Sequence, residues 1–323
     1  KLKREIMSTK IRKALFISFL LCNGGFAFAQ KWYTSDVDKK VDEILNQMTI
    51  QEKLDYISGD FQFHTKPIKR LGVPAIRMSD GPQGVGHRIE TNAYPCGLAL
   101  AATWNEKLAY EYGQSLGRDC RARGIHIILG PAVNIHRAPM CGRNFEYFSE
   151  DPLVSGRMAG AITRGVQTIP GKGTTIKHFA CNNQEDNRMG VDSVVGERAL
   201  REIYLRGFQY AIEETQPKAL MTSYNLINGV HSANSYDLCT VSARKEWGYE
   251  GMSMTDWLTT TDGGSLRYVC MKAGNDMIMP GCAADHENIR QALNDGKLTM
   301  DELKACVVRI IRLALECEVK EQN

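Results

Sequence analysis

The stretch Met252-Ser253-Met254-Thr255-Asp256-Trp257 is a short apolar run that ends in an acidic and an aromatic residue. Similar runs recur along the chain, and each is followed by a longer amphipathic segment. Alternation of this kind, sustained over about 250 residues, favours a single-domain α/β fold, a (β/α)8 TIM-type barrel, over a doubly wound sheet. The predicted strands lie near residues 73–78, 98–102, 126–129, 174–179, 219–224, 252–255 and 276–279.

The segments between these runs carry helix signals. Residues 105–123 follow a cap formed by Thr103-Trp104-Asn105-Glu106 and end at Gly124. Two capping boxes, starting at Thr49 and at Thr299, each predict the start of a helix. Further helices are predicted at 37–48, from Pro152 onward, at 197–214 and at 300–317.

Polar residues stand at the carboxyl ends of several predicted strands, as in the active site of a barrel. They are Asp80, Lys177-His178, Tyr224-Asn225 and Asp256-Trp257. A dinucleotide-binding fold would need a Gly-rich turn that leads from the first strand into a helix. The segment 80–86 is rich in glycine but does not enter an apolar helix, so the barrel is the better prediction.

Composition excludes several classes of protein. The 323 residues are 43% hydrophobic and 24% charged, with a net charge of +3. Disordered, collagenous and polytopic membrane proteins have different compositions, so these classes are excluded. So small a net charge gives no support to nucleic-acid binding. Six Lys/Arg and one acid fall within residues 1–29, and the remaining 294 residues carry a net charge of −2.

Residues 1–29 have the pattern of a secretory signal peptide. A basic segment precedes the apolar run 14–21, and Ala27-Phe28-Ala29 forms an A-x-A cleavage site. We expect cleavage after Ala29, export to the periplasm or the extracellular space, no membrane span afterwards, and a mature domain at 30–323. A retained anchor is the alternative. Met7 looks like the true start, which would make residues 1–6 upstream translation.

The chain has ten cysteines, of which nine remain once Cys22 leaves with the signal. The number is odd, no CxxC occurs, and a chain of this size needs no disulfides to fold. We therefore favour buried free thiols over a disulfide framework. No spaced Cys/His cluster suggests a metal, and no cofactor is expected.

Asp256 is the central candidate for chemistry. At the end of a buried strand, a carboxylate needs hydrogen bonds or a partner. It could act as nucleophile or base, with Trp257 as a flat face for a sugar, or it could simply cap the next helix. Lys177 and His178 can donate hydrogen bonds to hydroxyls. Arg143 could bind a ligand or pair with Glu146 or Glu150. Tyr224 could instead be a packing residue.

Five motifs in this order resemble glycoside hydrolase family 3, the β-glucosidase and β-xylosidase family. They are Asp80-Gly81-Pro82, Gly142-Arg143-Asn144-Phe145-Glu146 running to Ser149-Glu150-Asp151-Pro152, Lys177-His178-Phe179, Met221-Thr222-Ser223-Tyr224-Asn225 with Asn228-Gly229, and Thr255-Asp256-Trp257. The resemblance implies that Asp256 is the nucleophile and that Trp257 flanks the sugar. It also implies that the sugar is held by Asp80, Arg143, Lys177, His178 and Tyr224. The family usually has Ser where this chain has Thr255.

A retaining glycosidase uses a nucleophilic carboxylate and a second carboxyl as acid and base. We expect nearby cations to lower the pKa of Asp256. Two-domain members of the family take the acid/base Glu from a C-terminal α/β sandwich. Because this chain stops at Asn323, we expect that domain to be missing and the chain to be the nucleophile half of a longer enzyme acting on a β-glycoside or small oligosaccharide.

Three alternatives stay open. Single-domain β-N-acetylhexosaminidases of the family use Asp-Ser-His as acid/base, whereas this chain has Asp192-Ser193-Val194. A non-catalytic sugar-binding barrel would keep the binding groups and lack the acid. Finally, the acid could come from the barrel itself, from Glu150, Glu185 or Asp186.

Overall fold

The computed structural model describes residues 35–60, 63–86, 90–261 and 263–318. The predicted signal peptide with Met7 and Cys22 lies outside these residues. By its internal contacts the chain divides into residues 1–40 and residues 41–323. Apart from the bounds of one helix that crosses residue 40, the account below concerns the second unit. None of the helices in the described ranges combines the length and apolar character that a membrane crossing requires.

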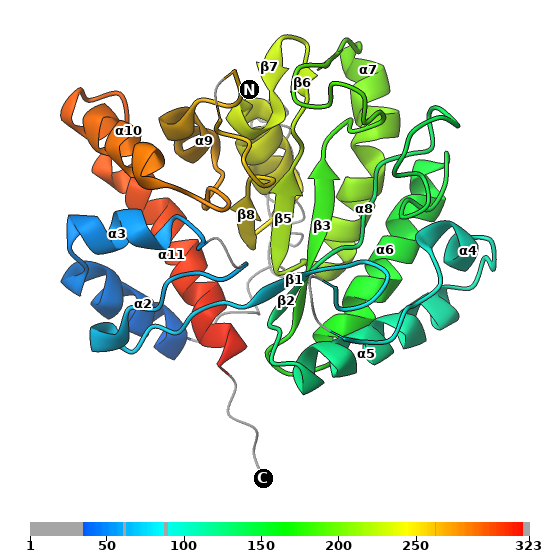
Figure 1. Cartoon of the computed structure of the whole chain (residues 1–323), viewed down its shortest axis with the longest axis horizontal. Coiled ribbons are helices and arrows are strands. Elements are labelled where there is room, and N and C mark those ends of the chain that lie inside the picture. Colours follow the sequence, from blue (N-terminus) through cyan, green and yellow to red (C-terminus); the bar gives the residue numbers. More distant parts are fainter. Residues whose placement is uncertain (1–34, 61–62, 87–89, 262, 319–323) are drawn as a thin grey trace, which may run out of the picture. The chain divides into compact units, whose positions relative to one another are not determined.

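Five parallel strands form the main sheet (Figure 1). In spatial order they are β1 (Met78–Asp80), β2 (Ile127–Leu129), β3 (Gly173–Phe179), β5 (Ala219–Thr222) and β8 (Met252–Met254). Every neighbouring pair is parallel. The carboxyl ends of all five strands therefore meet at one edge, where the sequence predicts the polar residues.

Short pairings continue the sheet beyond both of its edges. Met254 forms a parallel bridge to Met277, and Ile278 forms one to Ser58. On the β1 side, Arg77 forms an antiparallel bridge to His64. The predicted strand at 276–279 is thus a pair of bridges. The α/β class with a mostly parallel sheet is confirmed, and closure into an eight-stranded barrel stays a prediction.

A second, small sheet lies beyond the carboxyl ends of β3 and β5 (Figure 1). It consists of β4 (Asp192–Ser193), β6 (Leu226–Ile227) and β7 (Val230–His231) in the order β4-β6-β7. Asp192 pairs with Leu226, so this sheet joins the connections that follow β3 and β5.

Two strand predictions need correction. Of the predicted strand at 98–102, residues 98–101 form most of α4 (Gly97–Ala101) and Ala102 is its C-cap. Leu and Ala favour helices, and a short apolar run does not by itself distinguish a strand from a buried helix. The run at 73–78 becomes a strand only from Met78 onward. Pro74 lacks the amide hydrogen that a strand interior would use.

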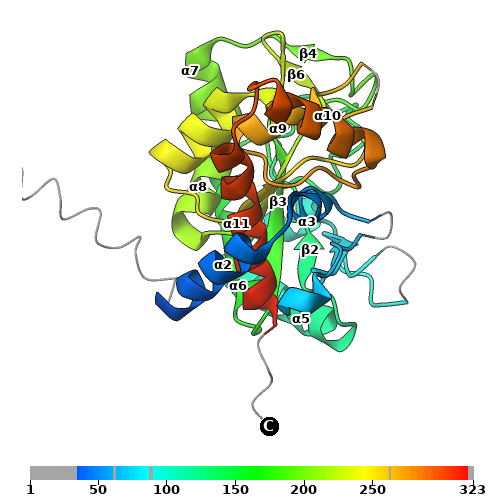
Figure 2. The ribbon, with the colours of Figure 1, turned by 90° about the vertical axis from the view of Figure 1, so that its left-hand side faces the viewer.

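Helices cover the sheet on both sides, with α5 (Glu106–Ala122), α6 (Pro152–Gln167) and α8 (Arg206–Thr215) on one side (Figure 1). α11 (Met300–Cys317) and α3 (Ile50–Tyr56) lie on the other, as Figure 2 also shows. The remaining α-helices are α2 (Ser35–Gln47), α7 (Glu197–Ala199), α9 (Arg267–Ala273) and α10 (Ala283–Asn294).

The predicted caps are mostly confirmed. The capping boxes at Thr49 and Thr299 are both present, and Asn105 caps α5 by accepting a hydrogen bond from the amide of Leu108. The predicted helix at 197–214 is interrupted, because a π-helical segment at Leu200–Tyr204 separates α7 from α8.

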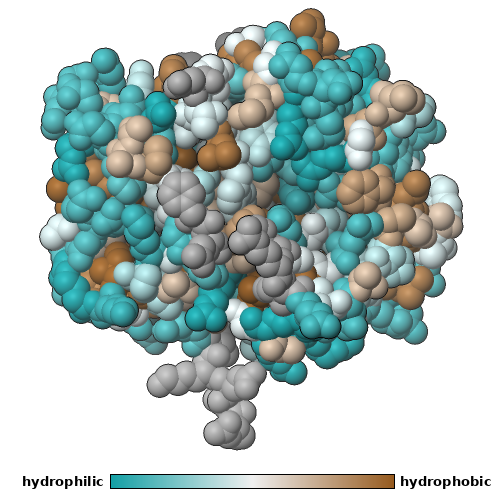
Figure 3. All heavy atoms as spheres, viewed as in Figure 1, coloured by the Kyte–Doolittle hydropathy of each residue, from teal (hydrophilic) through white to brown (hydrophobic). Residues whose placement is uncertain are grey.

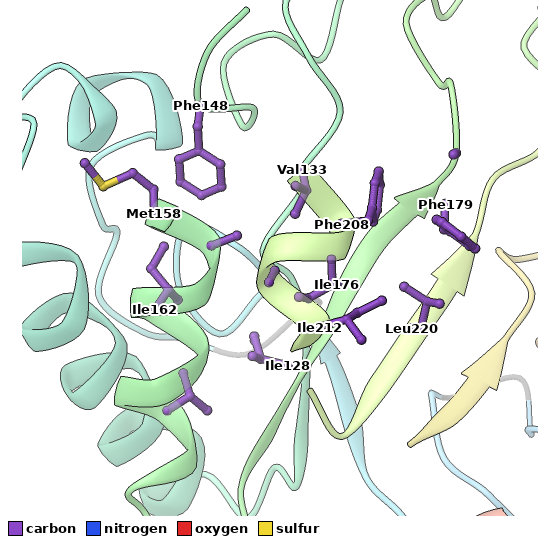
Figure 4. Packing of buried hydrophobic residues seen from close by; sticks show 14 of the residues in the cluster. Ile128, Val133, Phe148, Met158, Ile162, Ile176, Phe179, Phe208, Ile212 and Leu220 are labelled. Atoms are coloured by element: carbon purple, nitrogen blue, oxygen red, sulfur yellow. The ribbon is translucent and has the colours of Figure 1, made fainter. Parts of the chain in front are cut away.

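The main core lies between the sheet and the helices α5, α6 and α8. Figure 4 shows Ile176 of β3 and Leu220 of β5 near Phe208 and Ile212 of α8. All four side chains are fully buried. By contrast, hydrophilic residues predominate on the face that Figure 3 shows, with hydrophobic ones scattered among them. The apolar side chains removed from water in this core stabilise the packing of the helices on the sheet.

The described cysteines are free thiols. Seven of them are buried, as the sequence predicts, while Cys96 is half-buried and Cys282 is exposed.

Candidate active site

The fold brings the predicted residues from four strands to one edge of the sheet. Asp80 is the last residue of β1, and Lys177 and His178 lie near the end of β3. Tyr224 lies two positions after the end of β5, and Asp256 lies two positions after the end of β8. His178 Nε2 and Asp256 Oδ2, from two of these strands, lie 3.7 Å apart.

Asp256 is a buried carboxylate, with 8% of the residue exposed. Its Oδ1 accepts a hydrogen bond of 2.7 Å from the backbone amide of Trp257. Burial raises the pKa of Asp256 above its usual value, and the cations Lys177 and Arg143, the Trp257 amide and the Tyr224 hydroxyl oppose the rise. The expectation of a lowered pKa was therefore wrong, because loss of water outweighs the attraction of the cations.

Thr255 fixes the backbone that carries Asp256. Its Oγ1 accepts a hydrogen bond of 3.0 Å from the amide of Met279, and its own amide donates to the carbonyl of Met277 at 3.0 Å. The amide of Leu258 donates to the carbonyl of Met279 at 2.8 Å. Serine could supply the same oxygen, so the change from the family's usual Ser retains this contact.

Arg143 and Lys177 share a buried acid, Glu146, which the sequence did not single out as a site residue. Arg143 Nε donates a hydrogen bond to Glu146 Oε1, and Lys177 Nζ lies 4.0 Å from Glu146 Oε2. Glu146 is 3% exposed. Of the two roles weighed for Arg143, the ion pair with Glu146 is thus present, and it holds the guanidinium where it also acts on Asp256. The signals in the sequence were its place at the end of the motif 142–146 and its spacing of three residues from Arg143.

Burial also lowers the pKa of the two basic side chains on β3, Lys177 and His178. It lowers the pKa of Lys177, against the opposing effect of Glu146, and Asp80 is among the acids that act on this lysine. It lowers the pKa of His178 well below the usual value, so the imidazole is neutral at neutral pH. A neutral ring with one donor and one acceptor nitrogen suits the hydroxyls of a sugar.

Asn134 holds His178 through the backbone and was not foreseen. Its amide nitrogen donates to the carbonyl of His178, and its oxygen accepts from the amide of His178, both at 2.9 Å. Among the described residues, the buried His178 Nδ1 and Trp257 Nε1 have no hydrogen-bond partner. A buried polar atom without a partner is costly, so a ligand hydroxyl that reached either atom would gain binding free energy.

Tyr224 and Trp257 form the aromatic part of the site. The Tyr224 hydroxyl donates to the carbonyl of Trp257 at 2.8 Å, so it is satisfied locally, as the packing alternative supposed. Tyr224 is also coupled to the candidate nucleophile: burial and then the negative charge of Asp256 raise the pKa of the phenol. The ring of Phe63, which the sequence did not indicate, stacks on Trp257 with centroids 4.6 Å apart.

The acids considered within the barrel differ in their surroundings. Glu185 accepts hydrogen bonds from Arg188 Nη1 at 2.8 Å and Asn182 Nδ2 at 3.1 Å. Both carboxylate oxygens of Glu185 are thus engaged by donors of its own connection, which leaves neither free to meet the leaving oxygen of a substrate. Glu150 and Asp186 are both exposed. Within the described ranges, no cluster of three or more His, Cys, Asp or Glu has the geometry to bind a metal ion.

Comparison with known families decides the membership of this chain. The model of the glycosyl hydrolase family 3 N-terminal domain matches residues 33–313. The chain belongs to this family. The resemblance carried by the five motifs is therefore confirmed.

Relatives within family 3 agree. Thermostable β-glucosidase B of Acetivibrio thermocellus is 38% identical over 297 residues, which are 88% of this chain and 39% of that protein. Probable β-glucosidase J of Neosartorya fischeri is 41% identical over 292 residues, covering 88% of this chain and 33% of that protein. The solved structure of β-glucosidase 3B from Thermotoga neapolitana in complex with glucose is 41% identical, with a TM-score of 0.80, over 86% of this chain and 42% of that one. This chain thus spans about two fifths or less of each relative.

Proposed function

We propose that this chain carries the nucleophile of a retaining, exo-acting β-glycosidase of the β-glucosidase type. One observation carries the proposal: Asp256 is buried at the carboxyl edge of the sheet and is influenced by Lys177, Arg143 and Tyr224, with His178 3.7 Å away. The β-glucosidase names of the family 3 relatives support it.

In the first step, Asp256 attacks the anomeric carbon, a covalent bond forms to its carboxylate, and the bond to the leaving oxygen breaks. Lys177 and Arg143 favour the charged form that attacks. His178 is held through its backbone amide by Asn134, and the carboxylate of Asp256 is held by the amide of Trp257. Both side chains are therefore in place before the substrate binds. Water hydrolyses the intermediate in a second step.

The leaving oxygen also needs a proton. We propose that this acid/base is a Glu in the C-terminal domain of a longer protein, as the resemblance implies. Glu185 is a poorer candidate because Arg188 and Asn182 both bind its carboxylate.

For the substrate, glucose is the first choice among terminal β-linked sugars, because the solved structure of the Thermotoga relative is a complex with glucose. Xylose is the second. Two further proposals accompany this function. Residues 1–29 direct export, and the bridges at Met277, Ile278 and Ser58 belong to a barrel wall that closes on β1.

A covalent trapping experiment tests the nucleophile without needing the acid. Incubation with 2,4-dinitrophenyl 2-deoxy-2-fluoro-β-glucoside should add one fluoroglucosyl unit, since dinitrophenolate leaves without protonation. Peptide mass spectrometry should locate the unit on Asp256. Asp256→Asn should not be labelled, whereas the exposed control Asp301→Asn should be labelled like the unsubstituted protein.

Two results would contradict the proposal. Labelling of Asp256→Asn would assign the nucleophile to another residue. Absence of labelling, together with glucose binding measured by calorimetry, would favour the non-catalytic sugar-binding barrel instead.

A further inference from the structure

Arg188 lies beside the candidate active site, although none of the five motifs contains it. It belongs to the connection between β3 and β4. Its Cζ lies 4.5 Å from the centroid of the Tyr224 ring, above the ring. The hydroxyl of Tyr224 binds the carbonyl of Trp257, next to Asp256. One aromatic ring therefore separates Arg188 from the segment that carries the nucleophile.

The guanidinium of Arg188 is held in position by its own connection. Nη1 donates to Glu185 Oε2 at 2.8 Å, and the amide of Arg188 donates to the carbonyl of Glu185 at 3.3 Å. Glu185 is itself held by Asn182, whose Nδ2 also reaches the hydroxyl of Tyr147 at 3.3 Å. Asn182 is 1% exposed, so the support is anchored in the core. A group held in this way loses little conformational freedom when it binds a ligand.

Arg188 lies nearer to solvent than the other cations of the site. The side chains of Lys177 and Arg143 are 6% and 19% exposed, whereas that of Arg188 is 36% exposed. Its charge still reaches the site, because it is among the causes that lower the pKa of His178 and oppose the rise at Tyr224. Arg188 therefore belongs to the solvent end of the wall that Tyr224 forms.

The solvent end of the site, where Arg188 lies, is where the leaving part of a substrate would extend. A sugar whose anomeric carbon meets Asp256 occupies the buried end, and the unit attached to that carbon extends toward solvent. An arginine has five N–H donors, and among the described residues only Nη1 is engaged in a hydrogen bond. Glu185 offsets the positive charge, so a neutral unit with hydroxyls fits better than an anion.

We propose that Arg188 is a specificity residue that donates hydrogen bonds to the hydroxyls of the sugar on the leaving side of the cleaved bond. Its ligand class is the second sugar of a neutral β-linked disaccharide. This inference rests on the proposed function, because it takes the cleaved bond to lie against Asp256.

Calorimetry with two ligands that the protein does not cleave on the time scale of the titration tests the proposal. Methyl β-glucoside fills only the buried end, and thiocellobiose adds a second sugar. In Arg188→Ala, the ratio of the thiocellobiose Kd to the methyl glucoside Kd should rise by about tenfold or more, as expected for the loss of a hydrogen bond to a charged donor. Arg188→Lys should raise it less, since the charge remains and the planar fork is lost. Arg198→Ala, which removes another arginine from a surface pair, should leave it unchanged.

An equal loss of affinity for both ligands in Arg188→Ala would mean that Arg188 only supports Tyr224, and this would overturn the proposal. An unchanged ratio would overturn it as well. If Arg188→Ala fails to fold, the same Kd ratio is measured in Arg188→Lys. A higher ratio than in the unsubstituted protein is expected, and an unchanged ratio would contradict the proposal. Failure of the unsubstituted protein to bind either sugar would instead overturn the proposed function, and this inference with it.

Discussion

Burial opposes the charged form of Asp256, although Lys177, Arg143, Tyr224 and the Trp257 amide favour it. A carboxyl group whose pKa is raised by folding destabilises the fold at every pH above that pKa and does not do so below the pKa of the unfolded chain. Asp256→Asn should therefore raise the Tm at pH 7, by about 2–4 °C for each kcal/mol regained. Thermal scans should show the difference shrinking as the pH falls toward 4. A lower Tm for the variant at pH 7 would contradict this account.

Lys177 has the opposite effect on the same carboxyl group. It is the largest of the influences that lower the pKa of Asp256, so Lys177→Met should raise that pKa further. Because the ionised form attacks, labelling by the fluoroglucoside rises with pH, and its acidic limb should move to higher pH in the variant. The exposed control Lys297→Met should keep the original limb. A limb that moves to lower pH would show that Lys177 does not stabilise the carboxylate.

Among the elements, the pair α5 and α6 depends on glycine where the two backbones meet. A Cβ added to Gly113 would lie 2.2 Å from the carbonyl oxygen of Ile162. Alanine is the better helix former by about 1 kcal/mol, but the overlap with backbone should outweigh this. We expect Gly113→Ala to lower the free energy of unfolding by about 1–3 kcal/mol in urea titrations.

Gly160 of α6 provides the matched control for Gly113. A Cβ there would meet its nearest atom, Cγ2 of Thr215, at an ordinary contact distance of 3.5 Å. Gly160→Ala should therefore stabilise the protein, by up to about 1 kcal/mol. Equal effects of the two substitutions would mean that helix propensity, and not the close approach of α5 and α6, decides the outcome.

For the whole molecule, thiol reactivity reports on the integrity of the core. Burial raises the pKa of Cys120, Cys181, Cys239, Cys306 and Cys317 to about 12. Since the thiolate is the reactive form, these groups should resist a thiol reagent in the native protein. Among the cysteines that the structure describes, exposed Cys282 should react first and half-buried Cys96 more slowly. Mass spectrometry of each modified peptide checks the order, and rapid native labelling of Cys239 would contradict the described core.

Local patterns in the sequence determined much of the fold. The runs at 126–129, 174–179, 219–224 and 252–255 became β2, β3, β5 and β8, and the run at 300–317 became α11. Caps and periodicity depend on residues a few positions apart, which explains why they could be read directly. The same reading put Lys177, His178, Tyr224 and Asp256 at one edge, because parallel strands share that edge.

Only the tertiary structure decided the rest. The predicted strand at 98–102 is the helix α4 up to Ala101, and nothing in its short apolar run distinguishes such a helix from a strand. The pairing of Lys177 with Glu146, the hold of Asn134 on His178 and the contact of Arg188 with Tyr224 join residues 31 to 44 positions apart along the chain. The raised pKa of Asp256 belongs here too. A sequence lists the cations near an acid, whereas the loss of water that outweighs them arises only when the chain packs around it.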